Sequence, residues 1–196
     1  MARLGIDHGA RMNLEPLLKH VEPNDKIPPV ETWQPTQVGQ MDLTIAADGR
    51  WWHEGSEITR PRLVRLLSTL LRREADGHYY LVTPVEKQRI HVVDHPFVIV
   101  DADYEKSANC WWLTTNVGDQ LPLDAEHLLQ VTVTPDGEQV PEVPVRFGLS
   151  ARLGRNLYYR LVEQAELRHQ AGGVTEVGLT SAGVWQVLGE LPAEAT

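Results

Sequence analysis

The sequence has little of what marks secreted or membrane-spanning proteins. Cys110 is its single cysteine, so no intramolecular disulfide can form, which is typical of a reducing compartment. No run approaches the roughly 20 apolar residues needed to cross a bilayer. Residues 1–16 lack the apolar core of a secretory signal. We therefore expect a cytoplasmic protein without a membrane anchor.

Sequence motifs of the common catalytic and cofactor sites are also missing. The chain contains no Gly-x-Ser-x-Gly, no Gly-x-Gly-x-x-Gly and no phosphate-binding Gly-Lys-Ser/Thr. Ser150 is interpreted as a helix cap, Ser56 and Ser181 as turn residues, and Cys110 as a packed side chain beside two tryptophans. We expect no nucleophilic centre and no cofactor.

Positive charge is scarce in the second half of the chain. The formal net charge is −9, with 12 Lys and Arg against 13 Asp and Glu in residues 1–100, but 6 against 14 in residues 101–196. Nucleic acids and anionic membranes attract basic surfaces, so neither is expected as a partner.

Hydrophobic periodicity predicts two helices and a larger number of strands. The turn signal Asp48-Gly49 separates two alternating stretches and predicts a hairpin. One helix is expected to begin near Thr59, with leucines at helical spacing through Leu71, and a second near Ser150. Further strands are expected over residues 78–82, 89–93, 97–100, 111–115, 129–134, 143–147, 177–179 and 184–188.

The order of these elements predicts an α+β fold. Two helices are too few to cover a parallel sheet built from repeated strand–helix–strand units, so antiparallel sheets with helices packed on them are expected. Pro144 has no backbone N–H to donate, which predicts that its strand lies at an edge.

The chain divides into two small modules with short terminal extensions. We expect an N-terminal helix and proline-rich arm (1–36), an N-terminal α+β module (37–100), a C-terminal module (101–191) and a tail (192–196). Within the arm, a helix is predicted from Asn13 to about Val21. Residues 43–49 resemble residues 131–137, and both precede a leucine-rich helix. Either an internal duplication or the frequency of Asp-Gly turns explains this match.

Two histidines and a carboxylate suggest a metal site at first sight. In a strand, however, His91 and Asp94 point to opposite faces, and His91 and His95 lie about 13 Å apart at roughly 3.3 Å per residue. We expect no metal at this cluster.

Arginines on the first predicted helix suggest an anion site. Five of them lie between residues 60 and 73, a stretch without an acidic residue. Arg60 would act beside the free amide groups of a helix N-terminus. The alternatives are a solvated helix face, or pairing with residues 101–145, which hold nine acidic residues and only Lys106 as a basic one. The polar turn Thr83–Lys87 is another candidate, or an ordinary surface turn.

Several stretches together resemble a bacterial family known as a domain of unknown function. The resemblance runs from about residue 28 to 189, with its most specific motifs in the first half. They are Pro28–Pro35, Asp48–Trp51, His53–Arg60, Leu63–Leu67, Tyr80–Lys87 and Ile90–Phe97, followed by Thr115-Asn116, Ala151–Leu153, Arg155, Tyr158-Tyr159 and Leu161–Glu163. Pro61, after Arg60, departs from the family pattern.

The resemblance implies a duplicated core and a C-terminal module that is superficially like a pleckstrin-homology domain. It further implies a nucleotide-like ligand at the interface of the two modules and a role in signalling, without an established enzymatic activity. It places the Arg60, Thr83, Glu86 and Lys87 region against the partner module.

The leading hypothesis is a non-enzymatic regulatory protein that binds a small anionic ligand between its modules. Arg60, Lys87 and Arg155 would contact the anion. Thr83 and Glu86 would supply hydrogen bonds, and Tyr159 or a tryptophan would stack on the ligand. One alternative is a module that docks a partner protein. Another is a small hydrolase or transferase that uses Glu86, Asp94 and His91.

Overall fold

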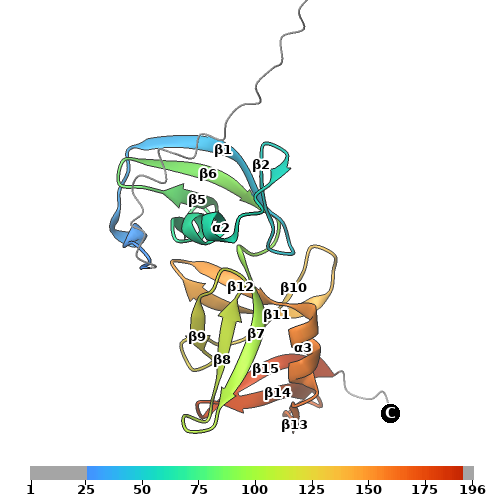
Figure 1. Cartoon of the computed structure of the whole chain (residues 1–196). Coiled ribbons are helices and arrows are strands. Elements are labelled where there is room, and N and C mark those ends of the chain that lie inside the picture. Colours follow the sequence, from blue (N-terminus) through green and yellow to red (C-terminus); the bar gives the residue numbers. More distant parts are fainter. Residues whose placement is uncertain (1–25, 192–196) are drawn as a thin grey trace, which may run out of the picture.

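The protein is described by a computed structural model over residues 26–191. The helix predicted at 13–21 and the tail at 192–196 lie outside these residues. Within the expected proline-rich arm, Val30–Thr32 form a short 3-10 helix, η1. The two modules are stacked end to end (Figure 1).

The N-terminal module is one six-stranded sheet with one helix. The sheet has the order β3-β2-β1-β6-β5-β4, and α2 lies on the side that faces the C-terminal module (Figure 1). Its elements are β1 (Gln37–Ile45), β2 (Trp51–His53), β3 (Ser56–Glu57), α2 (Pro61–Ser68), β4 (Leu71–Arg73), β5 (Tyr79–Val82) and β6 (Glu86–Val92).

The C-terminal module has a second six-stranded sheet, one helix and a small three-stranded sheet. The large sheet has the order β10-β11-β12-β7-β8-β9, and the small one has the order β13-β14-β15. The elements are β7 (Phe97–Glu105), β8 (Cys110–Thr115), β9 (Gln120–Pro122), β10 (Gln130–Val133), β11 (Gln139–Arg146), β12 (Leu149–Leu153), α3 (Arg155–Val162), β13 (Glu166–His169), β14 (Thr175–Ser181) and β15 (Val184–Leu191).

The two large sheets share one topology. In each, three consecutive strands form a meander, the next three form a second meander, and the first strand pairs with the last. The pairs β1·β6 and β7·β12 are parallel, and all other pairs of the two sheets are antiparallel. The expectation of purely antiparallel sheets was therefore wrong at one pair in each sheet. The shared topology supports a duplication.

The sequence match between residues 43–49 and 131–137 does not mark equivalent positions. The first turn joins β1 to β2, the opening hairpin of the first meander. The second joins β10 to β11, which belong to the second meander of their sheet. The two sheets share a topology, but this short sequence match does not reflect that shared topology.

The module boundary lies before β7, since Phe97–Glu105 pairs with β8 and β12. Residues 97–100 therefore belong to the C-terminal sheet, although the sequence placed them at the end of the first module.

Both helices are shorter than predicted. The first has Arg60, not Thr59, as its N-cap and ends at Ser68, because Leu71 turns into β4 and pairs with Leu81. The second begins at Arg155, since Leu149–Leu153 form β12 and Gly154 is extended. Both errors have the same cause: leucines of an adjacent buried strand, β4 after α2 and β12 before α3, fall at the same spacing as the leucines of the helix.

The prediction that Pro144 marks an edge strand was wrong. Its strand β11 lies between β10 and β12. The register shifts between Pro144 and Arg146, so the proline occupies an irregularity in the ladder, where a missing N–H is tolerated.

The cores of the two modules are continuous. Leu67, Leu70 and Leu71 of the first module belong to the same cluster of buried side chains as Phe97 and Leu149 of the second. Burial of apolar surface therefore holds the modules together as well as folding each one.

A buried arginine also joins the modules. Arg146 is 10% exposed, and both terminal nitrogens of its guanidinium lie 3.2 Å from the carbonyl oxygen of Ser68 in the N-terminal module. One of them also donates to Asp119 at 3.2 Å, and the guanidinium lies 4.9 Å from the centre of the Phe97 ring. Burial lowers the pKa of Arg146, while Asp119 opposes this effect.

A second ionic cluster ties the segment between the modules to the C-terminal sheet. Arg152 donates to both carboxylate oxygens of Asp94, at 2.8 and 2.7 Å, and to the Thr132 hydroxyl at 2.7 Å. His95 lies with its Nε2 2.6 Å from Glu142. Burial alone would raise the pKa of Asp94, but Arg152 and His95 together hold it below its ordinary value.

We predict that Arg146→Met lowers the unfolding free energy by about 3 kcal/mol, because it removes one partner of a buried ion pair. Urea unfolding measures the change. Arg155→Met is the matched control: Arg155 pairs with Glu138 at the surface, so its loss should leave stability nearly unchanged. Equal effects of the two substitutions would contradict the role of Arg146.

We predict that Asp94→Asn destabilises by about 3 kcal/mol at neutral pH, because Arg152 is left buried without its counter-charge. The pKa of Asp94 is lowered in the folded state, so its stabilising effect is present at neutral pH. That effect is lost as the pH falls through a value below 3.8. The difference between wild type and variant in urea unfolding should therefore narrow on acidification. A difference that grows in acid would refute the assignment.

Candidate functional site

The structure does not bring the six predicted site residues into one place. Lys87 lines one pocket, Arg155 and Tyr159 line a second, and Arg60 lies at the N-terminus of α2 beside a third. Thr83 and Glu86 belong to the turn that leads into β6.

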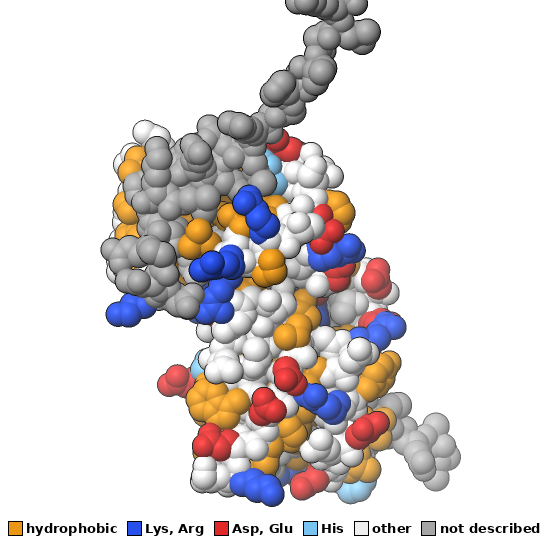
Figure 2. Space-filling view, viewed as in Figure 1, with side chains coloured by type: hydrophobic (Ala, Val, Ile, Leu, Met, Phe, Trp, Pro, Cys, Tyr) orange, Lys and Arg blue, Asp and Glu red, His pale blue; other side chains and the backbone are white. Residues whose placement is uncertain are grey.

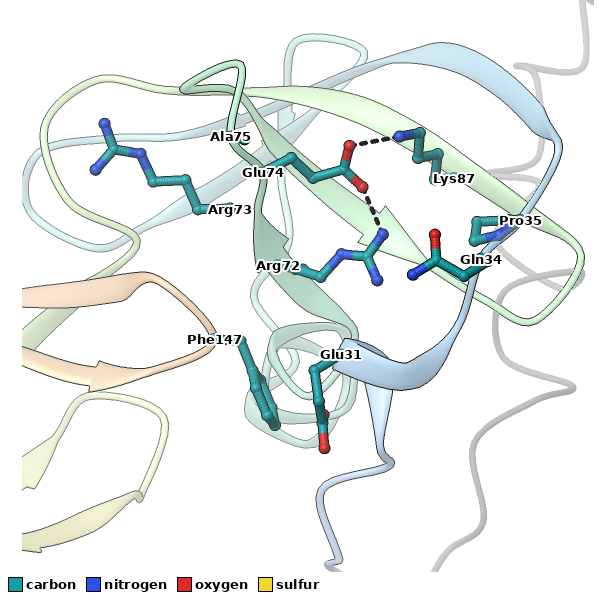
Figure 3. A pocket seen from close by; sticks show the side chains of 9 residues that line it. All are labelled: Glu31, Gln34, Pro35, Arg72, Arg73, Glu74, Ala75, Lys87 and Phe147. Carbon is teal, nitrogen blue, oxygen red and sulfur yellow. Dashed lines mark hydrogen bonds and ion pairs between the residues drawn. The ribbon is translucent and has the colours of Figure 1, made fainter.

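Lys87 lies in a pocket of about 400 Å³ around Glu74, the Glu74 pocket (Figure 3). The carboxylate of Glu74 lies between Lys87 and Arg72, 2.5 Å from each. Burial alone would raise the pKa of Glu74, but these two cations hold it below its ordinary value. Arg72 also donates to the carbonyl oxygens of Val30 and Trp33, which fixes the proline-rich arm. Lys87 and Arg72 thus already have a counter-charge, and Arg72 has a structural task as well.

Thr83 and Glu86 have local structural roles. The buried Thr83 hydroxyl donates to the carbonyl oxygen of Glu86 at 3.0 Å and accepts from the amide of Glu86 at 3.1 Å. The carboxylate of Glu86 accepts a hydrogen bond from Gln88. These contacts explain the polar turn as a device that ends β5 and starts β6.

Arg155 and Tyr159 come together at the start of α3. They line a pocket of about 280 Å³, the Tyr159 pocket, with the β10–β11 hairpin opposite. Arg155 donates to both carboxylate oxygens of Glu138, at 2.7 and 2.8 Å. Tyr159 is 57% exposed. An incoming anion would meet Glu138 and Asp136 here, which lowers the attraction of this pocket for negative charge.

The third pocket lies between the modules and has the most favourable charge for an anion. It measures about 520 Å³ and is called here the Arg62 pocket. One wall comes from β2, from residues 57–59 and from the first turns of α2, and the other wall is the turn Asn116–Gly118 of the C-terminal module. The sequence singled out Arg60, but the arginines that line this pocket are Arg50, Arg62 and Arg65.

Contacts between the modules shape the Arg62 pocket. Arg65 donates from Nη1 to the carbonyl oxygen of Val117 at 3.1 Å. Gly118 has a φ of +92°, and a Cβ there would lie 2.1 Å from Arg65 Nη1, so only glycine permits this approach. Asn116 donates to the carbonyl oxygen of Gly49 in the β1–β2 turn, at 3.3 Å.

The electrostatics of the Arg62 pocket favour an anion. Arg50 is paired with Asp48 at 2.7 Å and lies 3.8 Å from Glu57, the one acidic residue among the described residues of the lining. Among the described residues of the lining, three arginines therefore stand against one acidic residue. The first turn of α2 holds no acidic residue, and Arg60 gives the helix no side-chain cap. Pro61 has no N–H, and the amides of Leu63 and Val64 donate to the carbonyl oxygen of Arg60, so this terminus favours an anion chiefly through the helix dipole. Several Lys and Arg side chains lie on the N-terminal module close to the junction (Figure 2).

The remaining candidate centres do not assemble. Within residues 26–191, no group of three or more His, Cys, Asp and Glu side chains is placed to hold a metal ion. Asp94 is engaged by Arg152, while His91 is exposed on β6. Cys110 is buried against Ser181. None of the described helices is long and apolar enough to cross a membrane.

Sequence reasoning missed Arg62, Arg65 and the turn Asn116–Gly118 as parts of one pocket. The arginine-rich stretch was a signal for the first wall. Nothing local indicated the second wall, because it is brought there by the packing of the modules.

Family models match both halves of the chain. Residues 28–95 match the N-terminal domain of DUF1285, described as a domain of unknown function. Residues 96–188 match the C-terminal domain of the same family, described as a protein of unknown function. These bounds agree with the start of β7 at Phe97 as the beginning of the second sheet. No curated protein matches the chain.

Two crystal structures are similar to the protein. A DUF1285 family protein from Silicibacter pomeroyi DSS-3 is 37% identical, with 87% of this chain and 91% of that chain covered and a TM-score of 0.76. A DUF1285 family protein from Shewanella baltica OS155 is 30% identical, with 62% and 91% covered and a TM-score of 0.51. The resemblance inferred from the sequence motifs is confirmed, and the chain belongs to the DUF1285 family of proteins of unknown function.

Proposed function

We propose that the protein is a non-enzymatic regulatory protein that binds a small anionic, nucleotide-like ligand in the Arg62 pocket. The observation that carries this proposal is the position of Arg62 and Arg65 beside the uncapped N-terminus of α2, in a pocket with walls from both modules. Arginine suits a phosphate because its guanidinium donates two parallel hydrogen bonds.

The pocket has room and surface for more than a phosphate. A volume of about 520 Å³ lies within the range of small-molecule sites. Ile58, Val64 and Val117 supply an apolar lining, together with the largely buried Trp51. A nucleotide-like ligand fits this arrangement, with its phosphate bound by Arg62 and its flat ring packed against the apolar lining.

A ligand in this position would act on the arrangement of the two modules. It would touch α2 on one side and the turn Asn116–Gly118 on the other, next to the Arg65–Val117 contact. A ligand shifts an equilibrium only by its differential affinity for the two states. Binding here would stabilise the contact between α2 and this turn, and this local stabilisation is the proposed physical basis for a role in signal transduction.

The C-terminal module is further proposed to be pleckstrin-homology-like. Support comes from its largely antiparallel sheet, with β10 and β11 packed against β15 and with α3 packed against β7 and β15. In this chain the helix precedes the last three strands, so the likeness concerns the packing of sheets and helix.

We predict that a nucleotide or phosphorylated metabolite raises the thermal midpoint of the wild-type protein and that Arg62→Ala removes this shift. A ligand at 100 times its dissociation constant stabilises the folded state by about 2.7 kcal/mol. The measurement is thermal unfolding against a panel of nucleotides, followed by titration calorimetry with any compound that shifts the midpoint.

Arg89→Ala is the matched control, since Arg89 is an exposed arginine on β6 away from this pocket. Arg60→Ala tests whether Arg60, which the sequence predicted, or Arg62, which lines the pocket, holds the anion. If Arg62 holds it, Arg60→Ala should keep most of the shift in the thermal midpoint. Loss of binding in Arg60→Ala with full binding in Arg62→Ala would contradict the assignment. No shift with any anionic compound would refute the proposed function.

A further inference from the structure

The strand β13 is an open sheet edge at the end of the molecule away from the N-terminal module (Figure 1). Its four residues, Glu166–His169, are all exposed, and Leu167 is 58% exposed. An edge strand carries unpaired backbone N–H and C=O groups that can pair with another strand.

The register shows which backbone groups face outward. Gln170 donates from its amide to the carbonyl oxygen of Val174, which closes the β13–β14 hairpin. Hydrogen-bonded pairs alternate along an antiparallel ladder, so Glu166 and Arg168 bond to β14. The N–H and C=O groups of Leu167 and His169 therefore point away from the sheet.

Two other edge strands, β15 and β4, make contacts with further parts of the molecule. On the far side of the small sheet, β15 packs against β10 and β11. In the N-terminal sheet, the edge strand β4 donates from Arg73 to the carbonyl oxygen of Phe147. Among residues 26–191, nothing pairs with the outer side of β13.

We propose that two copies of this chain associate through antiparallel pairing of β13 with β13, centred on Leu167. In this register Leu167 lies opposite Leu167 of the partner copy, and their outward N–H and C=O groups form two hydrogen bonds. Glu166 lies opposite Arg168 of the partner copy, and this ion pair occurs twice. Charged side chains on an edge strand usually oppose its pairing with another strand. Here Glu166 and Arg168 carry opposite charges and attract each other across the two copies.

The side chains of Glu166 and Arg168 are already placed for this register in the single chain. Arg168 lies 3.8 Å from the centre of the Trp185 ring and donates to Thr180, which holds its stem on the sheet face that it shares with Glu166. Within the described chain the Glu166 carboxylate has no ion-pair partner. Pairing of two copies supplies one.

The competing antiparallel register is disfavoured by charge. Centring the pair on Arg168 would also satisfy the outward groups of Leu167 and His169. It would place Arg168 directly opposite Arg168 of the partner copy, and like charges directly opposite each other are destabilising. Charge therefore selects the register centred on Leu167.

The geometry also sets the strength of the dimer. A ladder this short buries less surface than the roughly 1,200–2,000 Å² of stable interfaces, so association should be weak and concentration-dependent. The two copies meet at the ends remote from their N-terminal modules (Figure 1). The Arg62 pockets, which lie between the modules, therefore stay open.

The test is sedimentation velocity of the full chain over a concentration series, with the variants Leu167→Pro, Glu166→Arg and Arg168→Glu. We expect a reversible monomer–dimer equilibrium for the wild type and at least a tenfold weaker association for each variant. Proline at Leu167 removes an outward N–H without touching the β13–β14 ladder. The double variant Glu166→Arg with Arg168→Glu restores the opposite-charge pairs and should regain dimerisation.

Glu126→Arg, an equal charge change at an exposed residue away from β13, is the control and should dimerise like the wild type. A thermal melt of each variant shows that it is folded. A wild type that stays monomeric at all concentrations overturns the proposal. So does a dimer that survives Leu167→Pro, or a double variant that stays as weak as the single ones.

Discussion

The parallel pairing of the first strand with the last organises both halves of this molecule. It places β1 and β6 at the centre of one sheet and β7 and β12 at the centre of the other. The chain therefore passes from one module to the next between central strands, through residues 93–96. Val93 donates to Ile45 of β1, and Asp94 accepts from Arg152 of β12, so this segment is tied to both centres. A short connection held at both ends leaves the modules little freedom to separate.

That constraint accounts for the pockets. Because the connection holds the modules together, α2 meets the turn Asn116–Gly118, and Ser68 meets Arg146. The Arg62 pocket exists through this contact and through neither module alone. The Glu74 pocket has a similar origin, since Phe147 of the C-terminal module completes it (Figure 3).

Local signals in the sequence predicted the local structure well. Asp48-Gly49 and Asp136-Gly137 form the expected hairpin turns, because a glycine with positive φ fits such a turn in any context. Leu70 and Leu71 misled the helix prediction. Both are fully buried, and burial in a strand that follows a helix directly continues the same apolar spacing.

The candidate site was less predictable than the fold, because its charged residues have partners that are distant in the sequence. Lys87 and Arg155 look like free cations in the sequence, but Glu74 and Glu138 neutralise them from other strands and turns. Such pairings follow from tertiary packing, which a pattern along the chain does not contain. The arginine-rich stretch pointed to the correct region, and the opposite wall had to come from the structure.

The order of the strands also bears on how the chain folds during synthesis. The central strand β1 cannot find its parallel partner until β6, at Glu86–Val92, has left the ribosome, and β7 must likewise wait for Leu149–Leu153. These are contacts of high sequence separation, whose loop-closure entropy is lost before any contact compensates for it. Until its parallel partner has been synthesised, each of β1 and β7 leaves the future central edge of its sheet unpaired. The nascent chain thus passes through two stages, one in each module, in which an unpaired central strand is open to other chains.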